Sequence, residues 1–521
     1  MNREKFKLVL TLCCILLYVP FFSVAKEKRV FISNHESTAL SQIQLLKIVC
    51  EKNFEIIYNK YDMEIASQQV KKEQEIFDSD LVVSYNYKES VTPNTAEEYY
   101  DRIYMDKFKE RSYSYQTGVK KLLPFGTLLS FDYTIDEIHN DLVDQKNEQI
   151  DEDISKETST FLGFQLTQPL LKNRGPENTK AKIRIAKTIV DISEQEYRQK
   201  VIDIVATALN NYWELYYTIK QYDIYKNSVK IANDLLITNI EMVEAGKVPE
   251  TDLFEIRSAL ALRRSLLSAA YQKVITAQNS IFKLSGKSRR AEKIKQYIPV
   301  DSPDYYYDSS KLDYDKIVKY ALLNNPGYLA RSLNVKKQDI HVAYAKNQAL
   351  PELNVKASYG INSLDKRPET FWEHMWTQND ETWSIGMYFS MPLTGKINTN
   401  SELRVARIRK KQALLALRSI TIDFENQIDT SIQKVKSSRV QVERHIDNVN
   451  FKQKLMDIEI SNLKEGKSSS TRVLEMEKEL NQAKNGKLRA IVNLELSGIE
   501  LSRVDGSLLE KYNVDIGLDN K

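Results

Sequence analysis

Residues with the chemistry for catalysis or metal binding are few and scattered in this chain of 521 residues. The five histidines stand far apart, with none of the short spacings that ligate a metal or activate a nucleophile. They are His35, His139, His341, His374 and His445. The sequence also lacks a glycine-rich phosphate loop and a nucleophile motif. We therefore expect no enzyme activity, no cofactor and no bound metal, so function must come from the architecture.

The composition favours export and does not suggest a nucleic-acid partner. The formal net charge is only +4, far from the strongly basic balance of nucleic-acid-binding domains. The N-terminus has a basic start, an apolar middle from Leu8 to Phe22 and a small residue at Ala25. This layout predicts a secretory signal peptide at 1–25. Cys50 is the only cysteine after that segment, so no intramolecular disulfide can form.

Much of the sequence occurs twice. Residues 175–286 align without a gap on residues 395–506, an offset of 220, and Gly246-Lys247 then falls on Gly466-Lys467. Upstream, an offset of 274 places Tyr85 on Tyr359. The offsets differ by 54 residues (274 minus 220), which locates an insertion between the strand at Tyr85 and residue 175. The chain is therefore one structural unit used twice.

Two very long helices dominate each half. The segments 177–284 and 397–504 have helix-forming composition, and apolar residues in the first recur at spacings of 3 and 4, as in a coiled coil. These residues are Ile202, Val205, Leu209, Tyr212, Tyr216 and Ile219. The uninterrupted part would extend about 100 Å. Gly246 and Gly466 break the two tracts, which predicts tight turns between antiparallel helices.

Each half opens with a shorter helix followed by alternating, aromatic-rich strands. The first repeat, 26–286, has a helix at 38–76, a β region at 80–168 with an extra hairpin at 113–133, and the long helices at 177–284. The second repeat, 312–506, has a helix at 312–349, a β region at 352–391 and the long helices at 397–504. A linker at 287–311 joins the repeats, and a tail at 507–521 ends the chain.

The predicted strands are about ten residues long, which suits a tilted transmembrane strand, although short aromatic strands are equally common in soluble sheets. The sequence has no further apolar run long enough for a transmembrane helix. Two or three hairpins give four to six strands per chain, whereas the smallest membrane barrels have about eight. If the strands cross a membrane, several chains must therefore share one barrel.

The order of these parts resembles the TolC family of outer-membrane efflux channels, or outer membrane factors. The motifs that carry the resemblance are Asn324-Asn325-Pro326, Leu350-Pro351, Gln168-Pro169-Leu170 and the turn at 244–248. The first half departs from the pattern, with Glu51-Lys52-Asn53 and Phe77-Asp78 at the corresponding places. The resemblance implies a mainly α fold with a β-barrel part. In such a TolC-like trimeric α/β barrel, three chains form one barrel in the outer membrane and a helical tunnel across the periplasm.

The resemblance also implies partners and sites. It predicts a passive homotrimeric exit duct in outer-membrane lipid that passes small molecules or polypeptides. The duct would work with a periplasmic adaptor and an inner-membrane transporter, in a tripartite efflux or type I secretion system. The helix turns would form the periplasmic tip, where the adaptor docks on Gly246, Lys247, Val248, Gly466 and Lys467. The pore gate would comprise Thr251, Asp252, Glu255, Arg472 and Glu475.

Two departures at the tip qualify this expectation. The family's Tyr and Arg partners of Thr251-Asp252 correspond to Leu463 and Ser468 here. Arg472 and Glu475 stand where the family has an acidic ring, and residues three apart on a helix also form ordinary surface ion pairs. The second function that the sequence allows is a periplasmic coiled-coil scaffold or adaptor with a soluble β domain.

Overall fold

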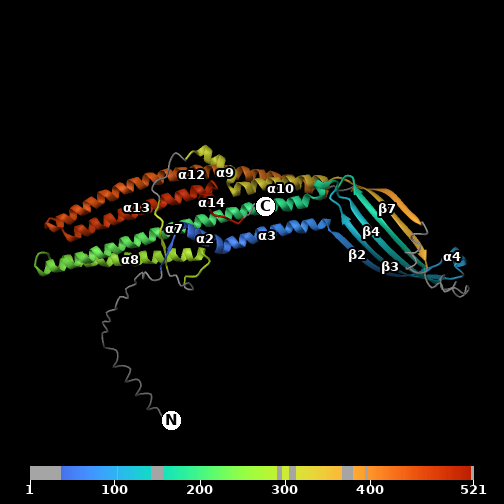
Figure 1. Ribbon diagram of the computed structural model, residues 1–521, viewed down its shortest axis with the longest axis horizontal. Coiled ribbons are helices and arrows are strands. Elements are labelled where there is room, and N and C mark those ends of the chain that lie inside the picture. Colours follow the sequence, from blue (N-terminus) through green and yellow to red (C-terminus); the bar gives the residue numbers. More distant parts are fainter. Residues whose placement is uncertain are drawn as a thin grey trace, which may run out of the picture.

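The computed structural model describes residues 37–102, 104–141, 157–289, 296–303, 312–365, 380–392 and 397–517. The predicted signal peptide at 1–25 lies outside these residues. The molecule is elongated, with long helices at one end and a sheet at the other (Figure 1). Among the described helices, none combines the length and the apolar composition that a membrane span requires.

Two antiparallel helical hairpins make up most of the helical part. The first pairs α7 (Ala181–Glu244) with α8 (Thr251–Leu284), and the short helix α6 (Pro176–Thr179) precedes it. The second pairs α12 (Ile397–Lys464) with α13 (Ser470–Val504). Because no proline or glycine interrupts α7, its 64 residues extend about 96 Å at about 1.5 Å each.

The two shorter helical segments differ from the prediction, because each is divided at an asparagine. The stretch predicted as one helix at 38–76 consists of four elements: β1 (Ser37–Leu40), α2 (Gln42–Lys52), α3 (Phe54–Gln74) and the 3₁₀ turn η2 (Glu75–Phe77). In the second half, the stretch at 312–349 contains α9 (Tyr314–Asn324) and α10 (Pro326–Gln348). Asn53 and Asn325 have extended backbones, and their side chains cap the helices that follow.

The asparagine breaks are equivalent in the two repeats. The Asn53 amide donates to the carbonyl of Leu284 at the end of α8, and the Asn325 amide donates to the carbonyl of Val504 at the end of α13, each at 3.0 Å. Each asparagine side chain therefore caps the helix that follows it and donates a hydrogen bond to the last residue of another helix. The first half keeps this contact although it lacks the Asn-Asn-Pro motif.

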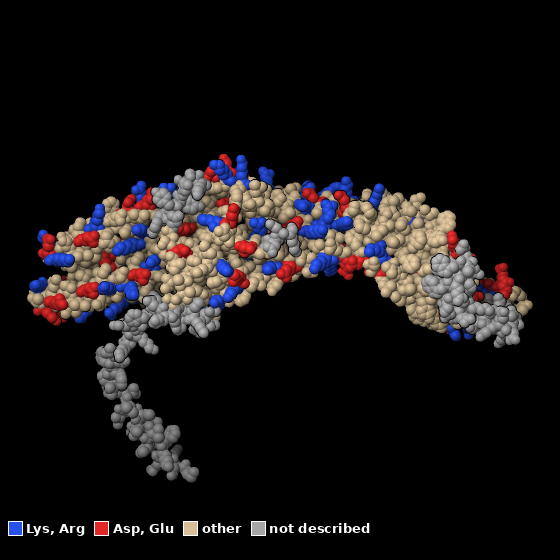
Figure 2. All heavy atoms as spheres, in the orientation of Figure 1, with Lys and Arg blue, Asp and Glu red and all other residues tan. Residues whose placement is uncertain are grey.

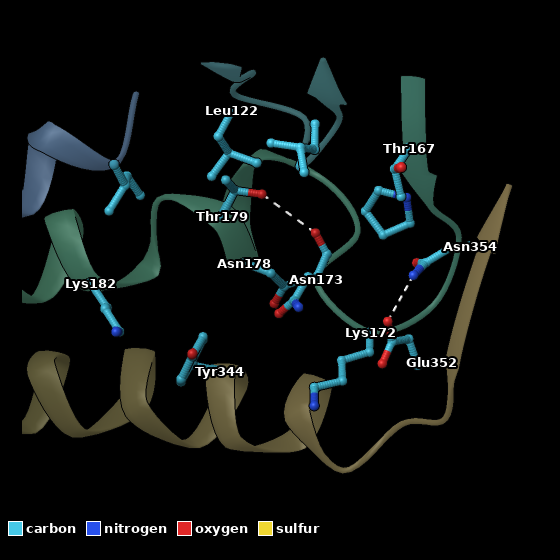
Figure 3. A pocket seen from close by; sticks show the side chains of 14 residues that line it. Leu122, Thr167, Lys172, Asn173, Asn178, Thr179, Lys182, Tyr344, Glu352 and Asn354 are labelled. Atoms are coloured by element: carbon cyan, nitrogen blue, oxygen red, sulfur yellow. Dashed lines mark hydrogen bonds between the residues drawn. The ribbon is translucent and has the colours of Figure 1, made fainter. Parts of the chain in front are cut away.

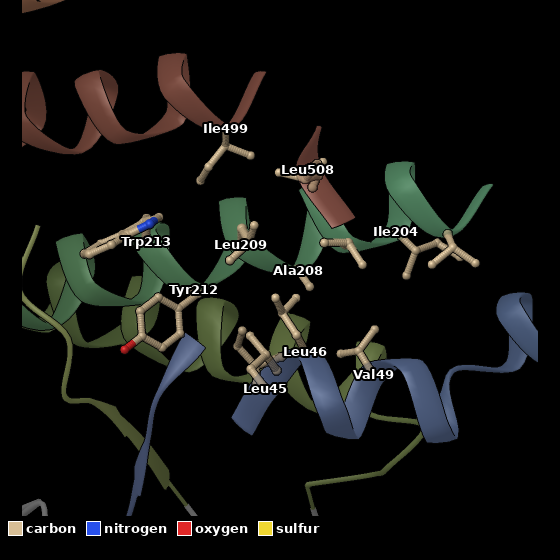
Figure 4. Packing of buried hydrophobic residues seen from close by; sticks show 14 of the residues in the cluster. Leu45, Leu46, Val49, Ile204, Ala208, Leu209, Tyr212, Trp213, Ile499 and Leu508 are labelled. Atoms are coloured by element: carbon tan, nitrogen blue, oxygen red, sulfur yellow. The ribbon is translucent and has the colours of Figure 1, made fainter. Parts of the chain in front are cut away.

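The largest apolar core surrounds the predicted coiled-coil row of α7 (Figure 4). Val205, Leu209 and Tyr212 are fully buried there, against α2 and the end of α13. Leu508 from α14 (Leu508–Lys511) also enters this core, so part of the predicted tail at 507–521 packs against α7. Part of the predicted linker at 287–311 is likewise structured, because β6 (Gln296–Pro299) pairs in parallel with β1.

The sheet has six antiparallel strands in the order β2-β3-β4-β5-β7-β8. Their bounds are β2 (Ser79–Pro93), β3 (Lys107–Leu122), β4 (Leu128–Asn140), β5 (Glu157–Pro169), β7 (Glu352–Asp365) and β8 (Glu381–Ser390). A short helix, α4 (Ala96–Asp101), lies between β2 and β3. The hairpin predicted at 113–133 is longer than expected and forms β3 and β4 inside the sheet.

The strand register separates the sheet into two chemically different faces. One face is apolar and aromatic, because residues such as Leu81, Val119 and Phe131 follow one another across neighbouring strands. On the edge strands this face is exposed, with Val83 at 72% and Ile385 at 71%. The visible side of the sheet in Figure 2 carries few charges, whereas the helices carry many of both signs. The opposite face carries mostly small or polar residues, such as Ser84, Gln116 and Asp132.

Candidate functional site: the helix-turn end

The turns of both helical hairpins lie at the end of the molecule opposite the sheet (Figure 1). Gly246 and Gly466 have left-handed backbones, with φ of 66° and 72°. In each turn the glycine N–H and the following lysine N–H donate back to carbonyls in the last turn of the preceding helix. These are Schellman caps, in which glycine is favoured because other residues adopt this φ with strain. Lys247, Val248 and Lys467 follow directly, so the predicted docking residues occupy two matching turns.

The predicted gate residues of the first half are only partly brought into contact with the second half. Glu255 on α8 accepts a hydrogen bond from the Thr471 hydroxyl on α13 at 2.9 Å. The side chains of Thr251 and Asp252 have no hydrogen-bond or ion-pair partner within the described ranges.

The predicted charged pair of the second half is an ion pair on one helix. Arg472 Nη1 lies 2.5 Å from Glu475 Oε2, and both side chains are about half exposed. The cap residue Ser469 accepts the backbone N–H of Arg472 at 3.2 Å, which fixes the start of α13. The pair cancels its own charge locally, so this surface presents no isolated carboxylate from Glu475.

The residues that replace the family's Tyr and Arg partners have other roles. Leu463 packs in an apolar cluster between α12 and α13, and the Ser468 hydroxyl donates to Glu459. Nearby, the Lys452 ammonium lies 2.5 Å from Glu479 and lowers the pKa of that carboxyl by hydrogen bonding. These contacts hold α12 to α13 within the second hairpin.

A buried set of contacts between the two hairpins was not predicted from the sequence. We call it the inter-hairpin seam and define it by Arg263 on α8, Asn239 on α7, and Ser470 and Glu477 on α13. Arg263 Nη2 lies 2.7 Å from Glu477 Oε2, and the two side chains are only 9% and 2% exposed. The Asn239 amide donates to the Ser470 hydroxyl at 2.5 Å, closer to the turns.

The seam satisfies the charges that it buries. Arg263 also donates to the carbonyls of Leu474 (2.9 Å) and Ala259 (3.2 Å), and the Asn481 amide donates to Glu477. A small apolar cluster lies alongside: Ala232, Ile256, Leu260 and Leu474. A buried charge pair needs such extra hydrogen bonds, because its desolvation otherwise exceeds the gain from pairing.

One signal in the sequence could have located the seam. Arg263 follows Ile256 and Leu260 at spacings of 4 and 3, so a charged residue stands in an apolar helical row. A charge in that position requires a buried partner. The partner itself, 214 residues away in the sequence, could not be identified without the fold.

At the other end of the helices, a cavity of about 300 Å³ lies where strands meet helices (Figure 3). Its lining comes from the β3–β4 turn, the start of α7, α10 and β7. Thr179 donates to the Asn173 carbonyl, and Asn354 donates to Glu352 at 2.7 Å. Within the described ranges no group of His, Cys, Asp and Glu side chains could hold a metal ion.

The fold resembles solved outer-membrane channels. The chain is similar to the CmeC outer membrane channel of Campylobacter jejuni, at 15% identity and a TM-score of 0.62, over 90% of this chain and 86% of that chain. A membrane protein from Pseudomonas aeruginosa matches at 13% identity and a TM-score of 0.64, over 90% and 91%. The outer membrane protein VceC of Vibrio cholerae matches at 12% identity and a TM-score of 0.62, over 89% and 96%. At these identities the likeness concerns the fold.

A comparison with curated proteins gives no match to the chain. The family follows instead from a comparison with models of protein families. The family model for outer membrane efflux proteins matches residues 129–287 and 317–507, one stretch in each repeat. This match confirms the predicted resemblance, and it identifies an efflux protein of the outer membrane rather than an enzyme. The chain belongs to the outer membrane efflux protein family.

Proposed function

We propose that the chain is the outer-membrane exit duct of a tripartite efflux or type I secretion system. Three copies form a passive channel, which works with a periplasmic adaptor and an inner-membrane transporter. The observation that carries the proposal is the sheet with one apolar and one polar face, continuous with helices about 96 Å long. A wall of this kind suits lipid on one side and water on the other.

A single chain leaves this wall incomplete. The six strands of the described residues are fewer than the roughly eight of the smallest membrane barrels, and in the described sheet the edge strands β2 and β8 each have a neighbour on one side only. Exposed apolar edge strands such as β2 and β8 invite pairing with other chains. Closing the sheet with further copies removes the edges and leaves the apolar face for lipid.

The helix-turn end is the proposed gate and docking surface. The adaptor would contact the turns at Gly246-Lys247-Val248 and Gly466-Lys467. The gate would comprise Thr251, Asp252, Glu255, Arg472 and Glu475, with the inter-hairpin seam holding the two hairpins of each chain together in the closed state. Small molecules or polypeptides would pass once the hairpins separate.

The alternative of a periplasmic scaffold is less well supported, because a soluble β domain would leave the apolar face of the sheet in water. Membrane fractionation separates the two functions. We expect the protein to stay with outer membranes after a carbonate wash and to run in mild detergent as a trimer that heat dissociates. Release by carbonate, or a monomer with intact helical content, would overturn the duct.

A further inference from the structure

We infer that three chains close an 18-stranded barrel whose lumen admits polypeptide cargo with secondary structure, such as a helical hairpin. This inference rests on the proposed duct and deepens it. It depends on the inserted hairpin β3–β4, because without this hairpin each chain would supply four strands and the trimer only 12.

The inserted hairpin is an integral part of the sheet. β3 pairs with β2 along its whole length, from Ser79↔Lys121 to Pro93↔Lys107, and β4 pairs with β5 from Leu128↔Thr167 to Ile138↔Glu157. β2 and β5 therefore contact the hairpin on its two sides. Displacing it would break both ladders.

The turn of the hairpin is also anchored at the strand–helix junction. The Phe125 carbonyl accepts the Gly175 N–H at 3.1 Å, and the Thr127 hydroxyl donates to the Gln168 side chain. Gly126 has a φ of 91°, and a Cβ there would lie only 2.5 Å from the Asn173 carbonyl oxygen. The turn therefore fits closely against the chain that leads into α7 (Figure 3).

The edge strands permit a regular ring. Because all neighbours in the six-stranded sheet are antiparallel, the two edge strands β2 and β8 run in opposite directions. β8 of one chain can thus pair with β2 of the next chain in the antiparallel manner of the other strands. Six strands from each of three chains give 18, an even number that keeps this alternation around the ring.

The width of the helical layer fits six strands per chain. The helices next to the sheet pack in the row α3-α7-α10-α12. With interaxial distances of about 9 Å, four helices span about 36 Å. At a strand spacing of about 4.8 Å and a tilt of about 40°, six strands span about 38 Å, whereas four span about 25 Å. With the inserted hairpin, the sheet of each chain is therefore about as wide as its layer of four helices.

The same geometry gives the size of the lumen. The wall radius is about 18 Å for 18 strands and about 12 Å for 12. Allowing about 5 Å for inward side chains leaves openings about 26 Å and about 14 Å wide. Because a helix with its side chains is about 10–12 Å across, the wider barrel admits a helical hairpin and the narrower one a single helix.

The inner face is suited to such an opening. Ser84, Gln116 and Asp132 succeed one another across β2, β3 and β4, hydrogen-bonded in a polar row. One large apolar exception, Phe161, lies along the wall, since Cβ atoms added at Gly163 and Gly360 would come within 2.5 Å and 2.4 Å of its ring. Those two glycines therefore let the ring lie flat instead of projecting into the lumen.

Interchain cross-linking tests the ring. In a Cys50→Ser background, Ile385→Cys on β8 is combined in turn with Leu81→Cys, Val83→Cys and Tyr85→Cys on β2. We expect one combination to give a disulfide-linked ladder up to the trimer. The register partners Val119→Cys and Phe131→Cys on β3 and β4 are the matched control, which should cross-link only within the chain. A trimer without any β2–β8 ladder overturns the 18-stranded ring, whereas a monomer overturns the proposed duct as well.

Polymer sizing tests the lumen. Polyethylene glycol about 20 Å in hydrodynamic diameter, between the two estimated openings, is added on the barrel side of the full-length trimer in a planar bilayer. We expect it to enter and lower the conductance, and to be excluded by a variant lacking β3 and β4 (residues 107–140). Exclusion from the intact trimer overturns the wide lumen. If the deletion variant does not assemble, entry of the polymer into the intact trimer still decides between the two estimated openings.

Discussion

Removing the Arg263 side chain should favour the open state of the proposed gate at the helix-turn end. In Arg263→Ala the Glu477 carboxylate, now 2% exposed and 2.7 Å from the guanidinium, would remain buried without its cation. Removing one partner of a buried ion pair costs about 3–5 kcal/mol. An exposed pair contributes only about 0.3–0.5 kcal/mol, so burial distinguishes this site from the other ion pairs found among the described helices.

This cost in free energy destabilises the closed state, because the ion pair joins α8 of one hairpin to α13 of the other. When the hairpins separate, water can solvate Glu477 and the penalty disappears. At about 1.4 kcal/mol for each factor of ten, a loss of about 3–5 kcal/mol shifts the equilibrium toward the open state by roughly 140- to 3,700-fold. A channel with a very low open probability should then be open for much of the recording time.

Single-channel recording in planar bilayers measures this shift as open probability. Arg439→Ala is the matched control, because its partner Glu443 lies one turn away on the same helix and both side chains are exposed. Replacing both seam charges, as in Arg263→Met with Glu477→Leu, should restore closure through apolar packing. A wild-type open probability in Arg263→Ala, at normal trimer yield, would refute the assignment of the seam.

Local sequence signals were sufficient for the long helices, the turns and the two-faced strands. Glycine at 246 and 466 provides the left-handed residue that ends a helix, and alternation in β2 assigns the apolar face. The division of the segment at 38–76 could not be predicted in the same way. Asn53 ends α2 because its amide reaches the Leu284 carbonyl, a partner that only the tertiary fold supplies.

The same limit explains the other differences. β1 and β6 have four residues each and are stabilised by pairing with one another, so neither has a periodic pattern of its own. The inserted hairpin extends beyond 113–133 because the polar residues at its ends, such as Lys107 and Asn140, still pair in the ladder. Polar alternation there resembles an exposed loop when the neighbouring strands are unknown.

Three further changes test the tip and the helical part. Gly246→Val should abolish export but leave membrane insertion intact, because a β-branched residue is strained at φ 66° by about 1–3 kcal/mol. Gly246→Asn should export, because asparagine tolerates this φ. Normal export by the Gly246→Val variant would rule out the docking role. The Arg503 hydrogen bond lowers the pKa of Glu500 below its usual 4.5, so this contribution to stability is present above that pH and lost as the pH falls through the lowered pKa. The melting temperature of Glu500→Gln, followed by circular dichroism, should therefore fall less steeply in acid than that of the wild type; parallel curves would contradict the linkage. The last change concerns the charges that would face the pore. Arg472 lies 2.5 Å from Glu475, so the pair is nearly neutral, and Arg472→Ala should expose three carboxylates around the opening of a trimer. Reversal potentials in a salt gradient should then shift toward cation selectivity, and block by multivalent cations should increase. Glu475→Ala should shift selectivity toward anions by the same reasoning. On a surface away from the pore, loss of this exposed pair would alter stability by only about 0.5 kcal/mol and leave selectivity unchanged. Unchanged reversal potentials in both variants, with normal trimer yield, would therefore exclude Arg472 and Glu475 from the pore.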